Sequence, residues 1–230
     1  MKSFLVIGVG RFGRHLCKKL YELGYDVMAI DRNEDCIEPV LPYTLNSMIG
    51  DSTKSEFIKS IGVSNFDTCF VAIGDDFQTS LETTSLLSEC GAKYVVSRAS
   101  RDTQAKFLLR NGADEVVYPE RQLAEWSAIR YSSNNISNYI ELPGENSIFE
   151  CKVPKSWEGK TVLELDIRKK YKVNIMGIKK GDNWYMTITP QTKFEKDQDI
   201  MVYGANKYLK KFLNFDSSNF TTEEEAEEDD

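Results

Sequence analysis

Six short apolar runs alternate with amphipathic stretches along the first 132 residues, and this alternation constrains the fold more than any other feature of the sequence. The runs predict strands in SFLVIG (3–8), YDVMAID (25–31), TLNSMIGD (44–51), DTCFVAIG (67–74), KYVVSRA (93–99) and EVVYP (115–119). Helical patterns follow each of them, at about Phe12–Leu23, Glu34–Val40, Thr53–Ile61, Phe77–Glu89, Asp102–Asn111 and Glu120–Ser132. Six strand–helix units predict an α/β fold with a doubly wound parallel sheet.

Three glycines at the end of the first predicted strand form the frame G-x-G-x-x-G, as Gly8, Gly10 and Gly13. In a Rossmann-like fold they allow a tight turn, a close approach of backbone to phosphate, and packing of helix on strand. The N-terminus of the following helix then offers unpaired N–H groups to an anion. Asp31 ends the second predicted strand, 21 residues after Gly10, where an acid binds the ribose hydroxyls. The alternative is that the glycines only shape a turn.

Other polar residues follow the carboxyl ends of the later strands, where ligands bind in such sheets. Asp51 is a candidate contact near the base, Arg98 a candidate phosphate contact, and Glu120 a candidate ligand of a divalent cation or of a ligand hydroxyl. For each acid, capping of the next helix is the alternative. The remaining candidates belong to the same segments and are Phe12, Arg32, Ser52, Gly74 and Asp75.

Arg11 lies inside the glycine frame, where phosphate is expected. The central pyrophosphate of a dinucleotide is satisfied by backbone, whereas a terminal phosphate carries extra charge that a fork-shaped guanidinium can bind. Arg11 therefore favours a ligand with a terminal phosphate, and an exposed arginine on the first helical turn is the alternative.

The residues for catalysis are not evident. A dehydrogenase needs a proton donor or acceptor near the substrate carbon, and the single histidine, His15, follows the glycine loop on a helix. YGANK (203–207) has the Y-x-x-x-K spacing of short-chain dehydrogenases, but it lies after the last strand of the second half of the chain. We expect a non-enzyme, with a small NAD(P)-dependent oxidoreductase as the alternative.

The pattern changes after the polar stretch SSNNISN (132–138), which is suited to a hinge. Strand-like runs follow, with one helical pattern in TVLELDIRKKY (161–171) and a Gly-Asp turn in KKGDNWY (179–185) that predicts a hairpin. We expect a nucleotide-binding domain with its crossover helix over residues 1–137, a small α+β domain over 138–215, and a disordered acidic tail over 216–230.

Charge and composition set limits on partners and environment. The tail carries eight acids and no bases, so the other 215 residues hold 29 basic and 28 acidic residues. No basic stripe indicates nucleic-acid binding. No stretch has the roughly 20 apolar residues needed to cross a bilayer. Five widely spaced cysteines without C-x-x-C are typical of small buried residues in a reducing compartment, so we expect a cytosolic protein.

These residues resemble a known family. Residues 1–137 resemble the N-terminal lobe of RCK domains (regulator of potassium conductance, also called KTN) of bacterial Ktr- and Trk-type potassium uptake. The motifs are VIGVGRFG (6–13), DRNED (31–35), GDST (50–53), FVAIGDD (70–76), SRAS (97–100) and NGADEVVYPE (111–120). Residues 139–213 resemble the C-terminal lobe through GKTVLELDIRKKYKVNIMGIKKG (159–181), Pro190 and DQDIMVYG (197–204). One lobe of each kind resembles the Ktr regulatory subunit, since the Trk subunit duplicates both.

The resemblance implies a cytosolic homo-oligomer, typically an octameric ring built from dimers, docked on a membrane-embedded potassium-transporting subunit at the inner face of the membrane. Nucleotide in the N-terminal lobe would set the shape of the ring. The implied ligand is ATP or ADP, with Arg11 favouring ATP and Asp31 binding the ribose; NAD or NADH, used by Trk relatives, is the alternative. Glu120 would lie near the phosphates and a divalent cation, Mg²⁺ or Ca²⁺, at the dimer interface.

A second ligand is left open by the resemblance. Many C-terminal lobes of this family bind cyclic di-AMP between subunits, and Arg168, Ile175 and Pro190 fall where that pocket would be. Lys179 and Lys180 replace the usual basic or imidazole residues after the strand. The acidic tail is not part of the family pattern, and no function follows for it.

Overall fold

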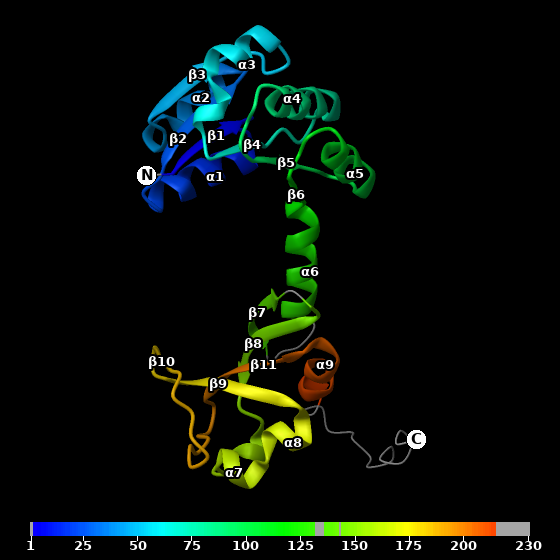
Figure 1. Cartoon of the computed structure of the whole chain (residues 1–230). Coiled ribbons are helices and arrows are strands. Elements are labelled where there is room, and N and C mark those ends of the chain that lie inside the picture. The colour runs from blue at the N-terminus through cyan, green and yellow to red at the C-terminus, as the bar shows by residue number, and fades with distance from the viewer. Residues whose placement is uncertain (1, 132–135, 143, 215–230) are drawn as a thin grey trace. The chain divides into compact units, whose positions relative to one another are not determined.

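The chain forms two compact units, residues 1–123 and 124–230, which are described separately. The structure is a computed structural model that describes residues 2–131, 136–142 and 144–214 (Figure 1). The predicted acidic tail lies outside the described residues, and the predicted lobe boundary at residue 137 stays a prediction. Within the described part of the chain, no helix has the length and apolar character needed to cross a membrane.

The first unit is built on a six-stranded parallel sheet with the strand order β3-β2-β1-β4-β5-β6. Its strands are β1 (Ser3–Ile7), β2 (Asp26–Asp31), β3 (Asn46–Ile49), β4 (Thr68–Val71), β5 (Val95–Arg98) and β6 (Glu115–Val117). Both β2 and β4 pair with β1, so the chain crosses from one side of β1 to the other between β3 and β4. This is the order of a Rossmann-like doubly wound sheet, as the sequence predicts.

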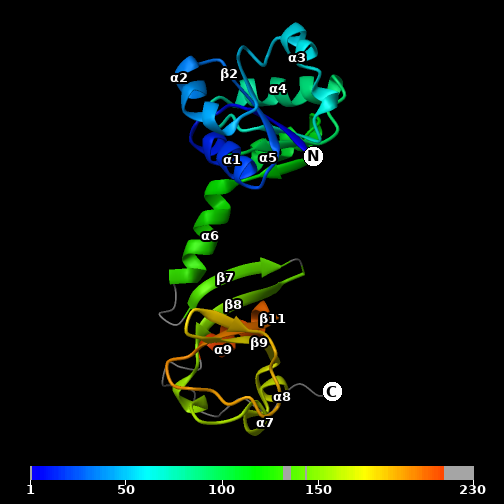
Figure 2. The same cartoon turned by 90° about the vertical axis from the view of Figure 1, so that its left-hand side faces the viewer.

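Helices cover both faces of this sheet (Figures 1 and 2). The covering helices are α1 (Arg11–Glu22), α2 (Glu34–Ile37), α3 (Ser55–Ile61), α4 (Phe77–Glu89) and α5 (Asp102–Arg110), with 3₁₀ turns η1 (Glu38–Tyr43) and η2 (Val63–Asn65). Helix α6 (Pro119–Tyr131) follows β6, has no buried residue and does not cover the sheet. Side chains alternate along β1, so Phe4 and Val6 pack with Cys17 of α1, while Leu5 and Ile7 pack with α3 and α4.

The predicted helix at 34–40 is divided. Four residues are α-helical in α2, and the 3₁₀ turn η1 continues from Glu38. Pro39 and Pro42 lie in this turn, and proline has no N–H with which to continue an α-helical hydrogen-bond ladder. The α-helix therefore ends at Ile37, and the 3₁₀ turn leads to β3.

The second unit contains a five-stranded antiparallel sheet with the order β10-β9-β11-β8-β7. Its elements are β7 (Ile136–Leu142), β8 (Asn146–Lys152), η3 (Lys155–Trp157), α7 (Val162–Leu165), α8 (Ile167–Tyr171), β9 (Val173–Lys180), β10 (Asn183–Tyr185), β11 (Asp199–Ala205) and α9 (Asn206–Asn214). Trp157 is 1% exposed at the centre of its core, beside Phe194 and Phe212. The predicted α+β character is confirmed, and so is the hairpin, whose Gly181 has φ 60°.

The sequence prediction differs from the structure in three places here. The helical pattern at 161–171 forms two helices, because Asp166 adopts a left-handed conformation with φ 45°. The predicted hinge at 132–138 includes the start of β7, where Ile136 is buried in the core; residues 132–135 lie outside the described residues. Helix α9 follows β11 and was not expected.

Candidate functional site

A cavity of about 600 Å³ lies in the first unit at the carboxyl ends of the parallel strands. Neighbouring strands β1 and β4 leave their loops on opposite sides there, which is where doubly wound sheets bind ligands. Twelve of the thirteen residues predicted for a nucleotide site line it. These are Gly8, Gly10, Arg11, Phe12, Asp31, Arg32, Asp51, Ser52, Gly74, Asp75, Arg98 and Glu120.

The three glycines of the loop have different physical roles. Gly8 has φ 88°, a conformation that side chains disfavour, and Gly13 packs so closely that an added Cβ would lie 2.1 Å from the Gly8 carbonyl oxygen. Gly13 does not line the cavity. A Cβ on Gly10 would meet no atom within 4 Å, so protein packing does not require glycine there. The space that a Gly10 side chain would occupy is open, so a ligand in the cavity can approach the backbone closely at this residue.

Helix α1 begins at Arg11, and its N-terminus is suited to binding an anion. Its N-cap, Gly10, provides no side-chain hydrogen bond, and its first turn contains no acid. The unpaired N–H groups and the positive end of the helix dipole are therefore available to a phosphate. Arg11 is exposed, lines the cavity, and forms no hydrogen bond or ion pair with any described residue.

Asp31 ties the glycine loop to the end of β2. Its Oδ2 accepts a hydrogen bond from the Val9 N–H at 2.8 Å, and its Oδ1 accepts one from the Asn33 N–H at 2.9 Å. Each carboxylate oxygen has a second lone pair, so both can still accept a hydroxyl of a bound ribose. Asp31 thus orders the loop and remains able to bind a ligand.

Arg98 is held among three cavity residues. Its guanidinium pairs with the carboxylate of Glu120 and lies 5.8 Å from the centre of the Phe12 ring. An added Cβ on Gly74 would lie 2.1 Å from Arg98 Nη1, so only glycine fits there without a shift. Partial burial acts to raise the pKa of Glu120, but hydrogen bonds from its own backbone N–H and from Arg98 outweigh it and hold the pKa below its ordinary value.

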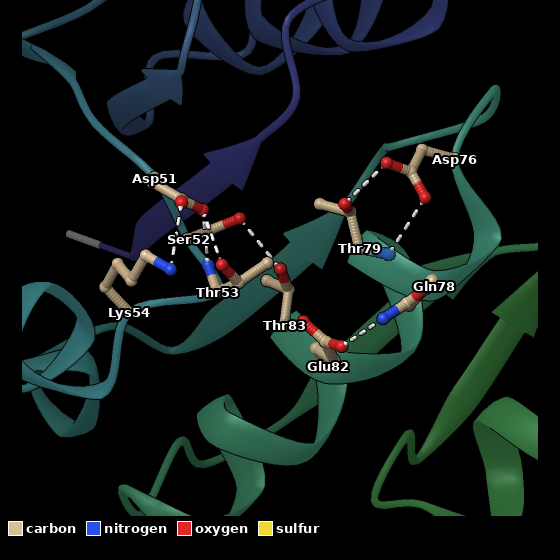
Figure 3. A network of polar contacts seen from close by, with 9 residues as sticks. All are labelled: Asp51, Ser52, Thr53, Lys54, Asp76, Gln78, Thr79, Glu82 and Thr83. Atoms are coloured by element: carbon tan, nitrogen blue, oxygen red, sulfur yellow. Dashed lines mark hydrogen bonds and ion pairs between the residues drawn. The ribbon is translucent and has the colours of Figure 1, made fainter.

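Two acid-capped segments form the other walls (Figure 3). After β3, Asp51 Oδ1 accepts hydrogen bonds from the Thr53 hydroxyl at 2.7 Å and the Thr53 N–H at 3.0 Å, which lower the pKa of Asp51. After β4, Asp76 caps α4, accepting from the Thr79 hydroxyl at 2.7 Å and the Thr79 N–H at 3.1 Å, and these bonds with the nearby charge of Arg32 lower the pKa of Asp76. The capping alternative given for Asp51 is wrong, because the N-cap of α3 is Lys54.

Several lining residues were not predicted from the sequence. Asn33 caps α2 and lies within the motif DRNED (31–35), and Thr79 lies on the first turn of α4, three residues after FVAIGDD (70–76). The residues around each strand end were therefore the available signal. The apolar lining residues carry no comparable signal. The full set that sequence reasoning missed is Ile7, Asn33, Cys36, Gly50, Ala72, Ile73, Asp76, Thr79 and Pro119.

Glu120 is the one predicted ligand of a divalent cation. Its carboxylate already pairs with Arg98, and no group of three or more Asp, Glu, His or Cys side chains suited to a metal occurs among the described residues. These residues alone do not form a cation site. His15 is exposed on α1 and does not line the cavity.

The cysteines behave mainly as small apolar residues. Cys17, Cys69 and Cys151 are buried, and burial raises the pKa of Cys17 and of Cys69 to about 12. Cys36 differs because it is half-buried and lines the cavity, and its Sγ lies 3.9 Å from Arg14 Nη2. The thiols of Cys17 and Cys69 are therefore unreactive at neutral pH.

The second unit has a cavity of about 430 Å³. It is lined by Val162, Leu163, Asp166, Ile167, Arg168, Ile175, Ile188, Thr189 and Pro190, so the three residues predicted for a second ligand lie together. Lys179 and Lys180 do not line it; they pair with Glu150 at 3.8 Å and Glu195 at 3.7 Å. The second unit also holds Tyr203 on β11 and Lys207 on α9, the residues with dehydrogenase-like spacing.

Comparison with known proteins matches two family models to the chain. Residues 4–119 match the TrkA-N domain and residues 148–216 match the TrkA-C domain. Ktr system potassium uptake protein C of Bacillus subtilis (strain 168) is 38% identical over 211 residues, which cover 92% of this chain and 96% of that protein. Ktr system potassium uptake protein A of the same strain is 32% identical over 213 residues, covering 93% and 96%.

A solved structure shares the fold. The GsuK channel bound to NAD superposes with a TM-score of 0.65 at 18% sequence identity, covering 97% of this chain and 40% of that one. The similarity in sequence to two Ktr proteins extends over nearly the whole length of each. The chain therefore belongs to the family of RCK regulatory subunits of Ktr-type potassium uptake systems.

Proposed function

We propose that the chain is a non-catalytic regulatory subunit that binds an adenine nucleotide in the first cavity and gates a potassium uptake transporter or channel. One observation carries the nucleotide assignment. The N-terminus of α1, the Arg11 side chain, which has no polar partner among the described residues, and Asp31 at the end of β2 line one cavity at the switch point of the sheet. Membership of the Ktr family supports the regulatory role.

The ligand that fits best is ATP or ADP. Phosphates would lie against the α1 N-terminus, the ribose against Asp31, and the base toward Asp51, with Arg98 a further phosphate contact. Arg11 supplies a charge that a terminal phosphate can use, which supports ATP over NAD or NADH. A ligand changes a conformational equilibrium only through different affinities for the two states, and a contact specific to one phosphate count provides that difference.

The partners follow from the family. We propose that dimers assemble into an octameric ring docked on a membrane-embedded potassium-transporting subunit, with the chain at the cytoplasmic face of the membrane. A divalent cation such as Mg²⁺ or Ca²⁺ would need ligands beyond Glu120, because the described residues do not supply a complete set.

Cyclic di-AMP is a proposed second ligand, at the cavity of the second unit. Support comes from Arg168, which offers a guanidinium, and from the apolar Ile175 and Pro190 beside it. Lys179 and Lys180 are engaged by glutamates, so this site would rely on Arg168 for its positive charge.

A thermal-shift panel tests the ligand assignment. A ligand that binds only the folded state raises the melting temperature, so ATP and ADP should raise it more than NAD or NADH does. A rise with cyclic di-AMP that Arg168→Ala removes would support the second site. Stabilisation by NADH with none by ATP would exclude the proposed ligand.

Two further measurements test the non-catalytic role and the assembly. Incubated ATP and NADH should be recovered unchanged, because the chain is proposed to sense and not to convert its ligand. Size-exclusion chromatography with light scattering should show an octamer. A released product, or a monomer with and without nucleotide, would contradict the proposal.

A further inference from the structure

Helix α4 connects two walls of the first cavity through a residue that does not line it. Thr83 is fully buried, and its Oγ1 lies 2.7 Å from the Oγ of Ser52, a cavity residue that is 6% exposed. Thr79, one helical turn earlier, lines the cavity and bonds to Asp76. Figure 3 shows the two threonines on α4, with Thr83 directed at Ser52 on the segment after β3.

The segment after β3, residues 50–54, has few attachments to the rest of the protein. Its backbone is tied at its two ends, where the Gly50 N–H donates to the Asp31 carbonyl oxygen at 2.9 Å and the Lys54 carbonyl oxygen accepts from the Ile58 N–H at 3.1 Å. The side chains of Thr53 and Lys54 contact Asp51, within the segment itself. Among the described residues, the Ser52–Thr83 bond is the only hydrogen bond from a side chain of 50–54 to a residue outside. Between the two tied ends, this bond is what fixes Ser52, the neighbour of Asp51, to α4.

We propose that Thr83 is a positioning residue for the nucleoside part of the bound nucleotide, acting through Ser52 on the segment that carries Asp51. The inference rests on the proposed function. The segment lies at the ribose side of the cavity, because Ile49 at the end of β3 pairs in register with Asp31. The proposed phosphate contacts lie on other segments, at the α1 N-terminus, Arg11 and Arg98.

Substitutions of Thr83 and of Arg11 should affect the binding of ATP and ADP differently. ATP and ADP share the same nucleoside, so loss of the Ser52–Thr83 bond should weaken both by the same factor. Thr83→Val keeps the volume of the side chain and removes the hydroxyl, leaving the buried Ser52 hydroxyl without its partner. The segment can then shift to hydrate that hydroxyl, and Asp51 shifts with it.

Thr84 provides a matched control on the same helix. It is also fully buried, and its Oγ1 lies 2.8 Å from the Oγ of Ser97 and 2.8 Å from the Ser80 carbonyl oxygen. Ser97 is fixed in β5 by the backbone ladder and does not line the cavity. Thr84→Val therefore loses buried hydrogen bonds of the same kind without releasing a wall of the cavity.

The experiment is calorimetric titration of the full chain with ATP and with ADP, at a temperature where each variant is folded by circular dichroism. Thr83→Val should raise both dissociation constants about three- to tenfold, the range expected for one lost buried hydrogen bond. Thr83→Ser should stay within about twofold of the parent protein, and so should Thr84→Val, even though it lowers the melting temperature.

A double-mutant cycle gives a second readout. If Ser52 and Thr83 act as a unit, Ser52→Ala with Thr83→Val should bind no more weakly than the weaker single variant. If Thr83→Val does not fold, Thr83→Ala takes its place in the cycle. Unchanged binding by Thr83→Val, an equal loss with Thr84→Val, or additive effects in the cycle would overturn the inference. A parent protein that binds neither nucleotide would instead overturn the proposed function.

Discussion

Replacing Arg11 by alanine is expected to weaken the binding of ATP more than that of ADP. Arg11 is exposed, and its side chain forms no hydrogen bond or ion pair with any described residue, so its truncation breaks no such bond within the described structure. The N-terminus of α1, the proposed binding position for phosphates of both nucleotides, keeps its backbone N–H groups in this variant. What would be lost is the proposed contact to the γ-phosphate, which ATP carries and ADP does not.

The magnitude follows from one charge-assisted hydrogen bond, about 1.5–3 kcal/mol. Solvent exposure and salt reduce such contacts, so we expect the lower end, about 1.5 kcal/mol, which corresponds to about a tenfold higher dissociation constant for ATP. The dissociation constant for ADP should change less than about twofold. Isothermal titration in EDTA, at one fixed salt concentration, measures both without a bridging cation.

Two variants control this experiment. Arg11→Lys keeps the positive charge without the planar fork and should give an intermediate loss for ATP. His15→Ala changes an exposed residue on the same helix that does not line the cavity, and should bind both nucleotides as the parent protein does. An equal loss of ATP and ADP affinity in Arg11→Ala would refute the assignment of Arg11 to the terminal phosphate.

Three other substitutions test different parts of the structure. Asp31→Ala should weaken ATP and ADP alike, by about tenfold or more in titration, because it removes the proposed ribose contact and releases the Val9 N–H; selective loss of one nucleotide would contradict this. Trp157→Ala should cost about 3–5 kcal/mol in denaturant unfolding, whereas Trp157→Phe should cost less than half as much, since the buried Trp157 Nε1 has no hydrogen-bond partner within the described structure; equal costs would contradict it. Asp76→Ala should lower the melting temperature at pH 7. The pKa of Asp76 is depressed in the folded state, so the stabilisation by its carboxylate is present above the unfolded-state pKa of about 3.9 and is lost as pH falls through the folded-state pKa. A difference in melting temperature between variant and parent that persists at the lowest pH would contradict the capping role.

The first unit could be predicted from sequence because several local signals agree. The glycine frame, the acid after β2 and the polar residues after β3, β4 and β5 each mark a strand end, and parallel strands bring their carboxyl ends to one edge of the sheet. Residues as far apart as Arg11 and Glu120 therefore line one cavity. The same reasoning could not find the Arg98–Glu120 ion pair or the Ser52–Thr83 bond, because side-chain pairing across elements leaves no periodic signal.

The second unit was predicted less completely, since tertiary packing overrides local preference there. Ile136 begins a strand within a polar stretch because its side chain is buried in the core of the second unit. Asp166 interrupts a helical pattern in a left-handed conformation that the composition does not indicate. Helix α9 follows a strand without a recognised cap signal, and its Leu209 and Phe212 pack into the same core.

Hydrogen–deuterium exchange of the full chain, alone and with saturating ATP or ADP, tests most directly whether the cavity senses nucleotide. We predict slower exchange with both ligands in the glycine loop (8–13) and the segments 50–54 and 74–76, and a difference between ATP and ADP that extends beyond the cavity. Exchange that is the same with and without nucleotide, or the same with ATP as with ADP, would contradict a nucleotide-dependent regulatory subunit.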